Sequence, residues 1–381
     1  MIYFDWNATT PLHPEVAEHL ARAFRDGVDR PGNASSVHQG GRHARSRLDT
    51  ARGRLASILG CEPKEIVITG GGSEADALAL KGAFAARPDR ARTKVVISTI
   101  EHPAILQAAK QLEAAGATVI RVPPDPDGVV PAEAMIAHVG PDTALVSLMW
   151  ANNETGALQP VADVARACRR AGVLFHTDAV QAAGKVRVTL HEVDADLLSI
   201  SAHKFGGPAG IGALVVRRGV AIDPLVPGHQ ELGRRGGTQN LPYFEALALA
   251  FELAHRALDT EIPRLTALRD RFEQTLAREL DGITVNAGAV PRVPNTSNLR
   301  FAGVDGEALL IGLDLAGICV SAGAACASGS LTPSHVLSAM GLTPAQAHES
   351  LRFSIGRTTT DAEIDTVIAA LKEQVTRARA A

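Results

Sequence analysis

One lysine is singled out by the residues around it. Lys204 ends the segment Ser201-Ala202-His203-Lys204, which follows the short apolar run 197–200 that we expect to be a buried strand. A lysine is rarely buried without a partner, because its charged form is costly away from water. At a strand end it can lose its proton and form a Schiff base with a carbonyl compound. A solvated lysine is the usual alternative, and this motif alone leaves that alternative open.

The residues beside this lysine are suited to bind a phosphate group. Ser201 and His203 can both form hydrogen bonds, and the glycines between Gly206 and Gly212 allow close approach of other backbone. A carbonyl cofactor with a phosphate arm needs a lysine together with such groups. The segment therefore indicates a site for pyridoxal phosphate (PLP).

A carboxylate closes the preceding apolar run. The run 174–178 ends at Asp178, about one strand–helix–strand unit before Lys204. A PLP ring needs an acid beside its pyridine nitrogen, because the protonated ring is the form that accepts electrons. An isolated aspartate after a strand is more often a turn residue or a helix cap. An acid and a lysine that close successive strands favour the cofactor site.

A glycine turn lies between the apolar run 66–69 and a predicted helix that begins near Ser73. The free N–H groups and the dipole at a helix N-terminus bind phosphate, and Ser73 adds a hydroxyl. The pattern from Gly70 to Ala75 also fits the loose dinucleotide fingerprint, which requires an acid at the end of the next strand. The next strand ends instead in the segment 95–100, which has no acid. A dinucleotide-binding oxidoreductase stays an alternative.

A set of motifs resembles the cysteine desulfurases, specifically the NifS/IscS-like class of fold-type I PLP enzymes. The resemblance runs nearly end to end, and it departs from the family pattern at Trp6 and at Ala34. Trp6 is large enough to reshape the mouth of a site. The motifs occupy residues 3–11, 32–38, 101–103, 150–156, 176–181, 201–204, 235–240, 324–330 and 351–354.

The resemblance implies three catalytic residues. Lys204 would hold PLP and remove the α-proton of the substrate, the thiolate of Cys326 would attack the substrate sulfur, and His102 would stack on the PLP ring. The reaction implied converts L-cysteine to L-alanine and leaves a persulfide on Cys326. A selenocysteine lyase or an aminotransferase on the same fold is the runner-up, and a non-catalytic sulfur carrier is a further possibility.

The resemblance also implies the binding residues. Thr238 would reach the phosphate of a neighbouring subunit, which implies a homodimer with shared sites. Arg352 would bind the substrate carboxylate through its planar fork. Cofactor binding is assigned to Gly72, Ser73, His102, Asn153, Asp178, Gln181, Ser201, His203, Lys204 and Thr238, and substrate binding to Asn33, Asn153 and Arg352.

The four cysteines divide into two groups. Cys326 lies among small residues in the segment 320–330, which we expect to be an exposed, mobile loop. We interpret Cys61, Cys168 and Cys319 as small core residues. The absence of a C-x-x-C pair predicts no metal site within one chain, although Cys326 can ligate a transferred iron–sulfur cluster.

The composition of the chain limits the classes of partner that it can bind directly. The chain has 381 residues, 46% of them hydrophobic and 21% charged, with a net charge of −3. This balance does not favour nucleic acid or an anionic membrane as a direct partner. No apolar run approaches a membrane span, no signal peptide is visible, and free thiols suit a reducing cytoplasm. The expected protein partner accepts sulfur and is an iron–sulfur scaffold or a thiolation enzyme.

The order of helical and apolar stretches predicts an α/β fold. Short apolar runs alternate with helical stretches from residue 14 to about 255, which favours a mainly parallel seven-stranded sheet with helices on both faces. Ligands bind such sheets at the carboxyl ends of the strands. We expect a large PLP-binding domain over 14–255. Residues 1–13 and 256–381 should form a smaller α+β domain that carries the Cys326 loop.

Overall fold

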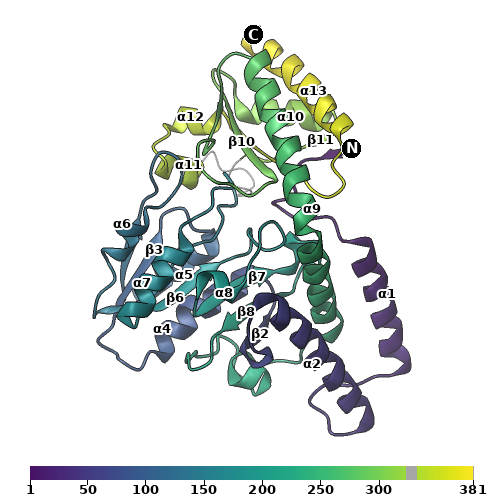
Figure 1. The fold of residues 1–381 in the computed structure, drawn as a ribbon, viewed down its shortest axis with the longest axis vertical. Coiled ribbons are helices and arrows are strands. Elements are labelled where there is room, and N and C mark those ends of the chain that lie inside the picture. The colour runs from purple at the N-terminus through teal and green to yellow at the C-terminus, as the bar shows by residue number, and fades with distance from the viewer. Residues whose placement is uncertain (323–332, 381) are drawn as a thin grey trace.

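Seven apolar runs form one sheet in the computed structural model, which describes residues 1–322 and 333–380 (Figure 1). The strand order is β2-β8-β7-β6-β5-β3-β4, and only the pairings of β8 with β2 and β7 are antiparallel. This confirms the predicted mainly parallel sheet. The strands are β2 (Ile66–Thr69), β3 (Lys94–Ser98), β4 (Thr118–Val122), β5 (Thr143–Ser147), β6 (Leu174–Asp178), β7 (Leu197–Ser201) and β8 (Gly212–Val216).

Successive residues of a central strand enter different hydrophobic cores. In β3, Val96 packs into one buried cluster, while Val95 and Ile97 pack into another on the opposite face. Helices on both faces therefore explain why these strands are continuous apolar runs. The helices around the sheet are α1 (Pro14–Asp29), α2 (Gln39–Leu59), α3 (Gly72–Ala77), α4 (Ala83–Ala86), α5 (Pro103–Ala114), α6 (Ala132–Ile136), α7 (Val161–Ala171) and α8 (Leu190–Val193).

A three-stranded antiparallel sheet and a parallel strand pair form a second, smaller layer. The sheet order is β12-β10-β9, and β1 pairs with β11. These elements are β1 (Ile2–Tyr3), β9 (Ile283–Val285), β10 (Thr296–Phe301), β11 (Ile318–Cys319), β12 (Ser350–Ser354), α10 (Gly306–Leu315), α11 (His335–Ala339), α12 (Pro344–His348) and α13 (Asp361–Ala380).

One long helix joins the two layers. Helix α9 (Leu241–Glu279) runs from beside α1 and α2 to α13 (Figure 1). Phe251, in its first half, belongs to the core of the large sheet, and Phe272, in its second half, belongs to the core of the small sheet. The expected boundary between residues 255 and 256 falls inside this helix, and the division into domains stays a prediction. Within the described residues, no helix is long and apolar enough to cross a membrane.

Candidate active site

A cavity of about 350 Å³ lies at the carboxyl ends of β6 and β7, where they face the small sheet. Parallel strands present their C-terminal ends at one edge, so residues far apart in sequence meet there. The structure brings ten of the residues proposed from sequence into its lining. They are Gly72, Ser73, His102, Asn153, Asp178, Gln181, Ser201, His203, Lys204 and Arg352.

Lys204 lies at the end of a short 3₁₀ turn, Ala202–Lys204, that directly follows β7. Its Nζ donates hydrogen bonds to the carbonyl oxygens of Asn7 and Ala8, at 2.7 and 2.9 Å. Burial, aided by the charge of Arg352, lowers the pKa of this amine to about 8. The amine can therefore lose its proton near neutral pH and act as a nucleophile or base.

Asp178 ends β6 and is almost fully buried. One carboxylate oxygen accepts a 2.8 Å hydrogen bond from the Val180 N–H. Burial raises the pKa of this carboxyl, and the charges of His102 and Lys204 oppose that rise. The Val180 N–H and the Lys204 charge thus oppose the effect of burial, and a bound pyridinium nitrogen would further favour the ionised form of this acid.

His102 is the N-cap of α5. Its Nδ1 accepts a 3.2 Å hydrogen bond from the N–H of Ala104. Burial lowers the pKa of the ring, although the charge of Asp178 acts in the opposite direction. A neutral imidazole whose Nδ1 is an acceptor carries its proton on Nε2. His102 thus offers the cavity a hydrogen-bond donor on a ring that can also stack.

The wall of the cavity formed by the start of α3 has the features of a phosphate cradle. A Cβ added to Gly72 would lie 2.8 Å from Val180 Cγ2, so only glycine lets the start of α3 approach this closely. The hydroxyls of Ser73 and Ser201 line the same cavity. Burial lowers the pKa of His203 to about 4, which leaves a neutral ring. Backbone N–H groups at a helix start with adjacent hydroxyls are suited to a phosphate monoester.

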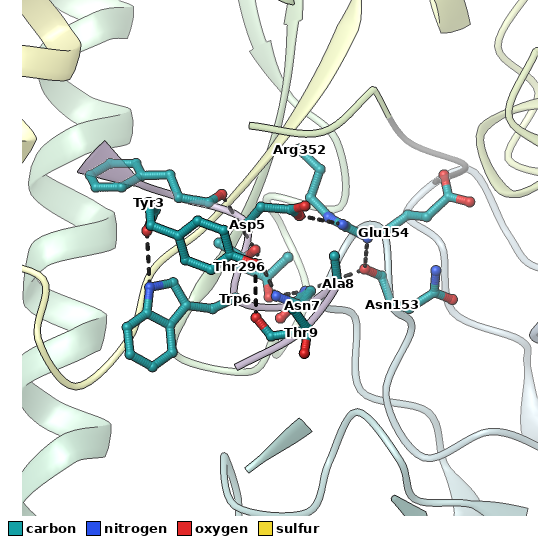
Figure 2. A network of polar contacts seen from close by, with 12 residues as sticks. Tyr3, Asp5, Trp6, Asn7, Ala8, Thr9, Asn153, Glu154, Thr296 and Arg352 are labelled. Atoms are coloured by element: carbon teal, nitrogen blue, oxygen red, sulfur yellow. Dashed lines mark hydrogen bonds and ion pairs between the residues drawn. The ribbon is translucent and has the colours of Figure 1, made fainter. Parts of the chain in front are cut away.

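Arg352 is buried on β12 and is 1% exposed. Its guanidinium donates to the carbonyl oxygen of Asn153 at 3.0 Å and to the carboxylate of Asp5 at 2.7 Å (Figure 2). Within the described residues, Nε of Arg352 and Oδ1 of Asn153 are buried and have no hydrogen-bond partner. The Arg352 guanidinium, held in place and with its Nε–H unused, is suited to bind a carboxylate. The unused Oδ1 of Asn153 is suited to accept a hydrogen bond from a ligand.

Comparison with known proteins identifies the family. The aminotransferase class-V profile matches residues 2–367. A cysteine desulfurase from Cereibacter sphaeroides is 45% identical over 382 residues, which cover 100% of this chain and 97% of that one. The chain belongs to the cysteine desulfurases of aminotransferase class V.

Solved structures of similar proteins share the whole fold. A NifS-like protein has a TM-score of 0.90 and 35% identity, and the match covers 99% of both chains. A structure of SspA in complex with cysteine has a TM-score of 0.82 and 32% identity, and the match covers 93% of this chain and 99% of that one. This cysteine desulfurase family member therefore has the predicted fold-type I architecture of PLP-dependent enzymes.

Several residues proposed for the desulfurase site do not reach the cavity of a single chain. Asn33 is exposed, and its side chain accepts a hydrogen bond from the N–H of Ser35. Thr238 is exposed and lines a separate pocket. Trp6, which departs from the family pattern and is large enough to reshape a site mouth, is buried against Gly356 and lines a neighbouring cavity that also includes Lys204. Cys326 lies outside the described residues.

The N-terminal segment contributes residues for which the sequence predicted no role. The side-chain amide of Asn7 donates a hydrogen bond to Thr296 Oγ1 at 2.8 Å (Figure 2). The backbone carbonyl oxygen of Asn7 accepts hydrogen bonds from Lys204 and Gln181. Asp5 holds Arg352, as described above. Both residues belong to the motif 3–11, but part of the contact is made by backbone, which has no side-chain signature.

Two further cavity residues come from the motif 150–156 and from the start of α11. The carboxylate of Glu154 accepts a 2.5 Å hydrogen bond from Ser334 Oγ. Nε2 of His335 donates to the carbonyl oxygen of Glu101 at 3.0 Å. These contacts attach the start of α11 to the rim of the cavity.

The three cysteines interpreted as core residues differ in burial. Cys168 is fully buried, as expected, whereas Cys61 and Cys319 are only half-buried. Burial raises the pKa of the Cys61 and Cys168 thiols to about 12, so neither is a ready nucleophile. In the part of the chain that the structure describes, no cluster of three His, Cys, Asp or Glu residues could hold a metal ion.

Proposed function

We propose that this chain is a PLP-dependent cysteine desulfurase, which converts L-cysteine to L-alanine and retains the sulfur. The observation that carries the proposal is the meeting of Lys204, Asp178, His102 and Arg352 around one cavity. Family membership supports it, and so does the related SspA structure, which contains cysteine. The test is to load the purified chain with PLP, add L-cysteine and quantify alanine and released sulfur.

The residues of the cavity fit PLP. Lys204 would hold the aldehyde carbon, Asp178 the pyridine nitrogen and Gln181 the phenolic oxygen. The start of α3 would hold the phosphate, together with Ser201 and His203. When bound, PLP supplies an electron sink next to the α-carbon of an amino acid.

The protein side chains would orient the substrate and move its proton. The guanidinium of Arg352 and the neighbouring Asn153 would bind the α-carboxylate and fix the α-carbon near Lys204. The amino group of the substrate would replace Lys204 at the aldehyde carbon, and the neutral amine so released would take the α-proton at Nζ. The carbonyl oxygens of Asn7 and Ala8 would then hold the resulting ammonium, because they already accept hydrogen bonds from Nζ. A proton on Nε2 of His102 is available to the other face of the site.

Cys326 would accept the sulfur. Its thiolate would attack the substrate sulfur, so that a sulfur–sulfur bond forms as the carbon–sulfur bond breaks, and the persulfide would pass to a second protein. An iron–sulfur scaffold or a thiolation enzyme is the class of acceptor that this chemistry serves. A reducing cytoplasm would keep the thiol available.

Replacement of Arg352 by alanine should impair use of cysteine much more than binding of PLP. Loss of a charged hydrogen bond corresponds to a decrease of about ten- to a hundred-fold in kcat/KM. Lysine at this position should restore little, because an ammonium group lacks the planar fork. The measurements are steady-state kinetics and a PLP titration. The matched control is Arg300→Ala, on β10 of the same sheet as Arg352, which breaks an ion pair with Glu349. An equal loss of PLP affinity in Arg352→Ala would contradict the assignment.

We also propose a homodimer with shared sites, in which Thr238 reaches the PLP phosphate of the partner subunit. The exposed position of Thr238, away from the cavity of its own chain, supports this arrangement. So do the exposed apolar side chains of Phe24, Val28 and Leu232, which an interface would cover.

A subunit-mixing experiment tests the shared site. Thr238→Ala should weaken PLP binding, and Lys204→Ala should be inactive. A mixed dimer would contain one intact site, formed by Lys204 of the first variant and Thr238 of the second. Mixing the two variants should therefore raise activity per functional lysine above that of Thr238→Ala alone. No gain after subunit exchange, verified by mass spectrometry of the dimers, would rule out the shared site.

A further inference from the structure

A second buried lysine lies close to the cavity, and the proposed reaction does not use it. Lys185 is 7% exposed and follows the turn after β6. Its Nζ donates a hydrogen bond to Oε1 of Gln181. It also lines a second cavity of about 120 Å³, whose wall includes Lys204. An apolar side chain of similar length would satisfy the packing here, so the presence of an amine calls for an explanation.

Lys185 and Lys204 are joined by a chain of hydrogen bonds. Lys185 donates to the oxygen of the Gln181 amide, and the nitrogen of that amide donates to the Asn7 carbonyl oxygen at 3.0 Å. The same carbonyl oxygen accepts the 2.7 Å bond from Lys204 Nζ. An amide has one accepting end and one donating end. Occupation of its oxygen by Lys185 therefore keeps its nitrogen directed at Asn7.

We propose that Lys185 is a positioning residue for Lys204, acting through Gln181 and the Asn7 carbonyl oxygen. The Asn7 carbonyl oxygen then accepts hydrogen bonds from both Gln181 and Lys204. A shared acceptor holds the ammonium form of Lys204 less firmly and favours release of the neutral amine. The inference rests on the proposed function, because it assigns Lys185 to the control of the amine that would react with PLP.

The charges around both lysines are consistent with this role. Burial lowers the pKa of Lys185 well below its usual value, and the charges of Lys204 and Arg352 act in the same direction. The lowered pKa reduces the tendency of Lys185 to carry a second charge beside Lys204, and either form of the amine can donate to Gln181. The titratable groups that face Lys204 are Asp5, His102, Asp178, Lys185, His203 and Arg352, and those around the second cavity are His13, Glu261 and Arg357.

Capture of PLP by the cofactor-free full-length chain tests the proposal. Capture joins Nζ of Lys204 to the aldehyde carbon and releases water, so only the neutral amine reacts. The capture rate, measured over a pH series by borohydride trapping and mass analysis of the Lys204 peptide, therefore follows the titration of Lys204. Without substitution, the midpoint should lie near the pKa of about 8.

The Lys185→Met variant should have a higher midpoint. Without Lys185 the Gln181 amide is no longer held, the Asn7 oxygen is free for Lys204, and the ammonium form gains stability. The expected rise is roughly half to one pH unit, the effect of one ordinary hydrogen bond. Gln181→Ala should raise the midpoint by a similar amount. The double variant Lys185→Met/Gln181→Ala should have a midpoint no higher than that of Gln181→Ala. Lys81→Met, which removes a similar lysine–amide contact with Gln111 on the exposed surface, should leave the midpoint unchanged.

The outcomes separate this inference from the proposed function. An unchanged midpoint in Lys185→Met, or a double variant whose rise is the sum of the two single rises, would overturn the positioning role. If Lys185→Met fails to fold, Gln181→Ala decides alone, because an unchanged midpoint there would also overturn it. Capture of PLP at a lysine other than Lys204 in the unsubstituted chain would instead overturn the proposed function.

Discussion

Replacement of Lys204 by alanine should abolish both the covalent attachment of PLP and the turnover of cysteine. Among the described residues, Lys204 is the one lysine in the lining of the cavity, while Lys185 lines the second cavity and is hydrogen-bonded to Gln181. The variant should lack the visible absorbance that comes from the covalent link between the lysine and PLP. Borohydride should link no PLP to the protein, although the phosphate cradle can still bind PLP without a covalent bond.

A matched control is available in Lys110, an exposed lysine on α5. Lys110→Ala should keep the absorbance and the activity of the unsubstituted chain. A stable, borohydride-reducible link between PLP and the Lys204→Ala variant would show that another lysine holds the cofactor. The assignment of Lys204 would then be wrong.

Replacement of Cys326 by serine should stop the transfer of sulfur but not the binding of PLP or cysteine. Serine preserves the size of the side chain but lacks a thiolate, which is the nucleophile that the reaction requires. The variant should still exchange the α-proton of cysteine with solvent, because that step depends on Lys204. Release of sulfide and formation of a protein persulfide should fall to background.

Cys319→Ser is the control for this variant, because Cys319 is the half-buried cysteine on β11. It should retain desulfuration. Appearance of labelled sulfur on Cys319 in the Cys326→Ser variant, together with continued turnover, would move the sulfur-accepting role away from Cys326.

Much of the large sheet could be predicted from the sequence. Strands such as β5 and β7 are buried on both faces, so they appear as continuous apolar runs, and Asp178 and Ser201 mark the ends of adjacent strands. Once these ends are recognised, the parallel arrangement brings Asp178 and Lys204 to one edge. The short elements were harder to find. Strand β9 spans only Ile283–Val285 and lacks a fully buried residue.

Other features of the site could not be predicted because they depend on distant backbone. The carbonyl oxygens of Asn7 and Ala8 hold Lys204 across almost two hundred residues of sequence, and no side-chain pattern encodes that contact. The packing of Trp6 on Gly356 requires the N-terminal segment to lie beside β12, which no local signal indicates. The proposed role of Thr238 involves a second subunit, and the exposed position of Asn33 depends on how the segment before α2 folds.

A single-turnover experiment with cysteine labelled at sulfur tests the central claim most directly. The PLP-loaded chain is mixed with a limiting amount of labelled L-cysteine and an oxo acid, and the products are analysed by mass spectrometry. A cysteine desulfurase should yield one alanine for each cysteine consumed, with the labelled sulfur attached to Cys326 and no amination of the oxo acid. Amination of the oxo acid without alanine would identify an aminotransferase. Turnover of selenocysteine but not of cysteine would identify a selenocysteine lyase, and either result would contradict the account.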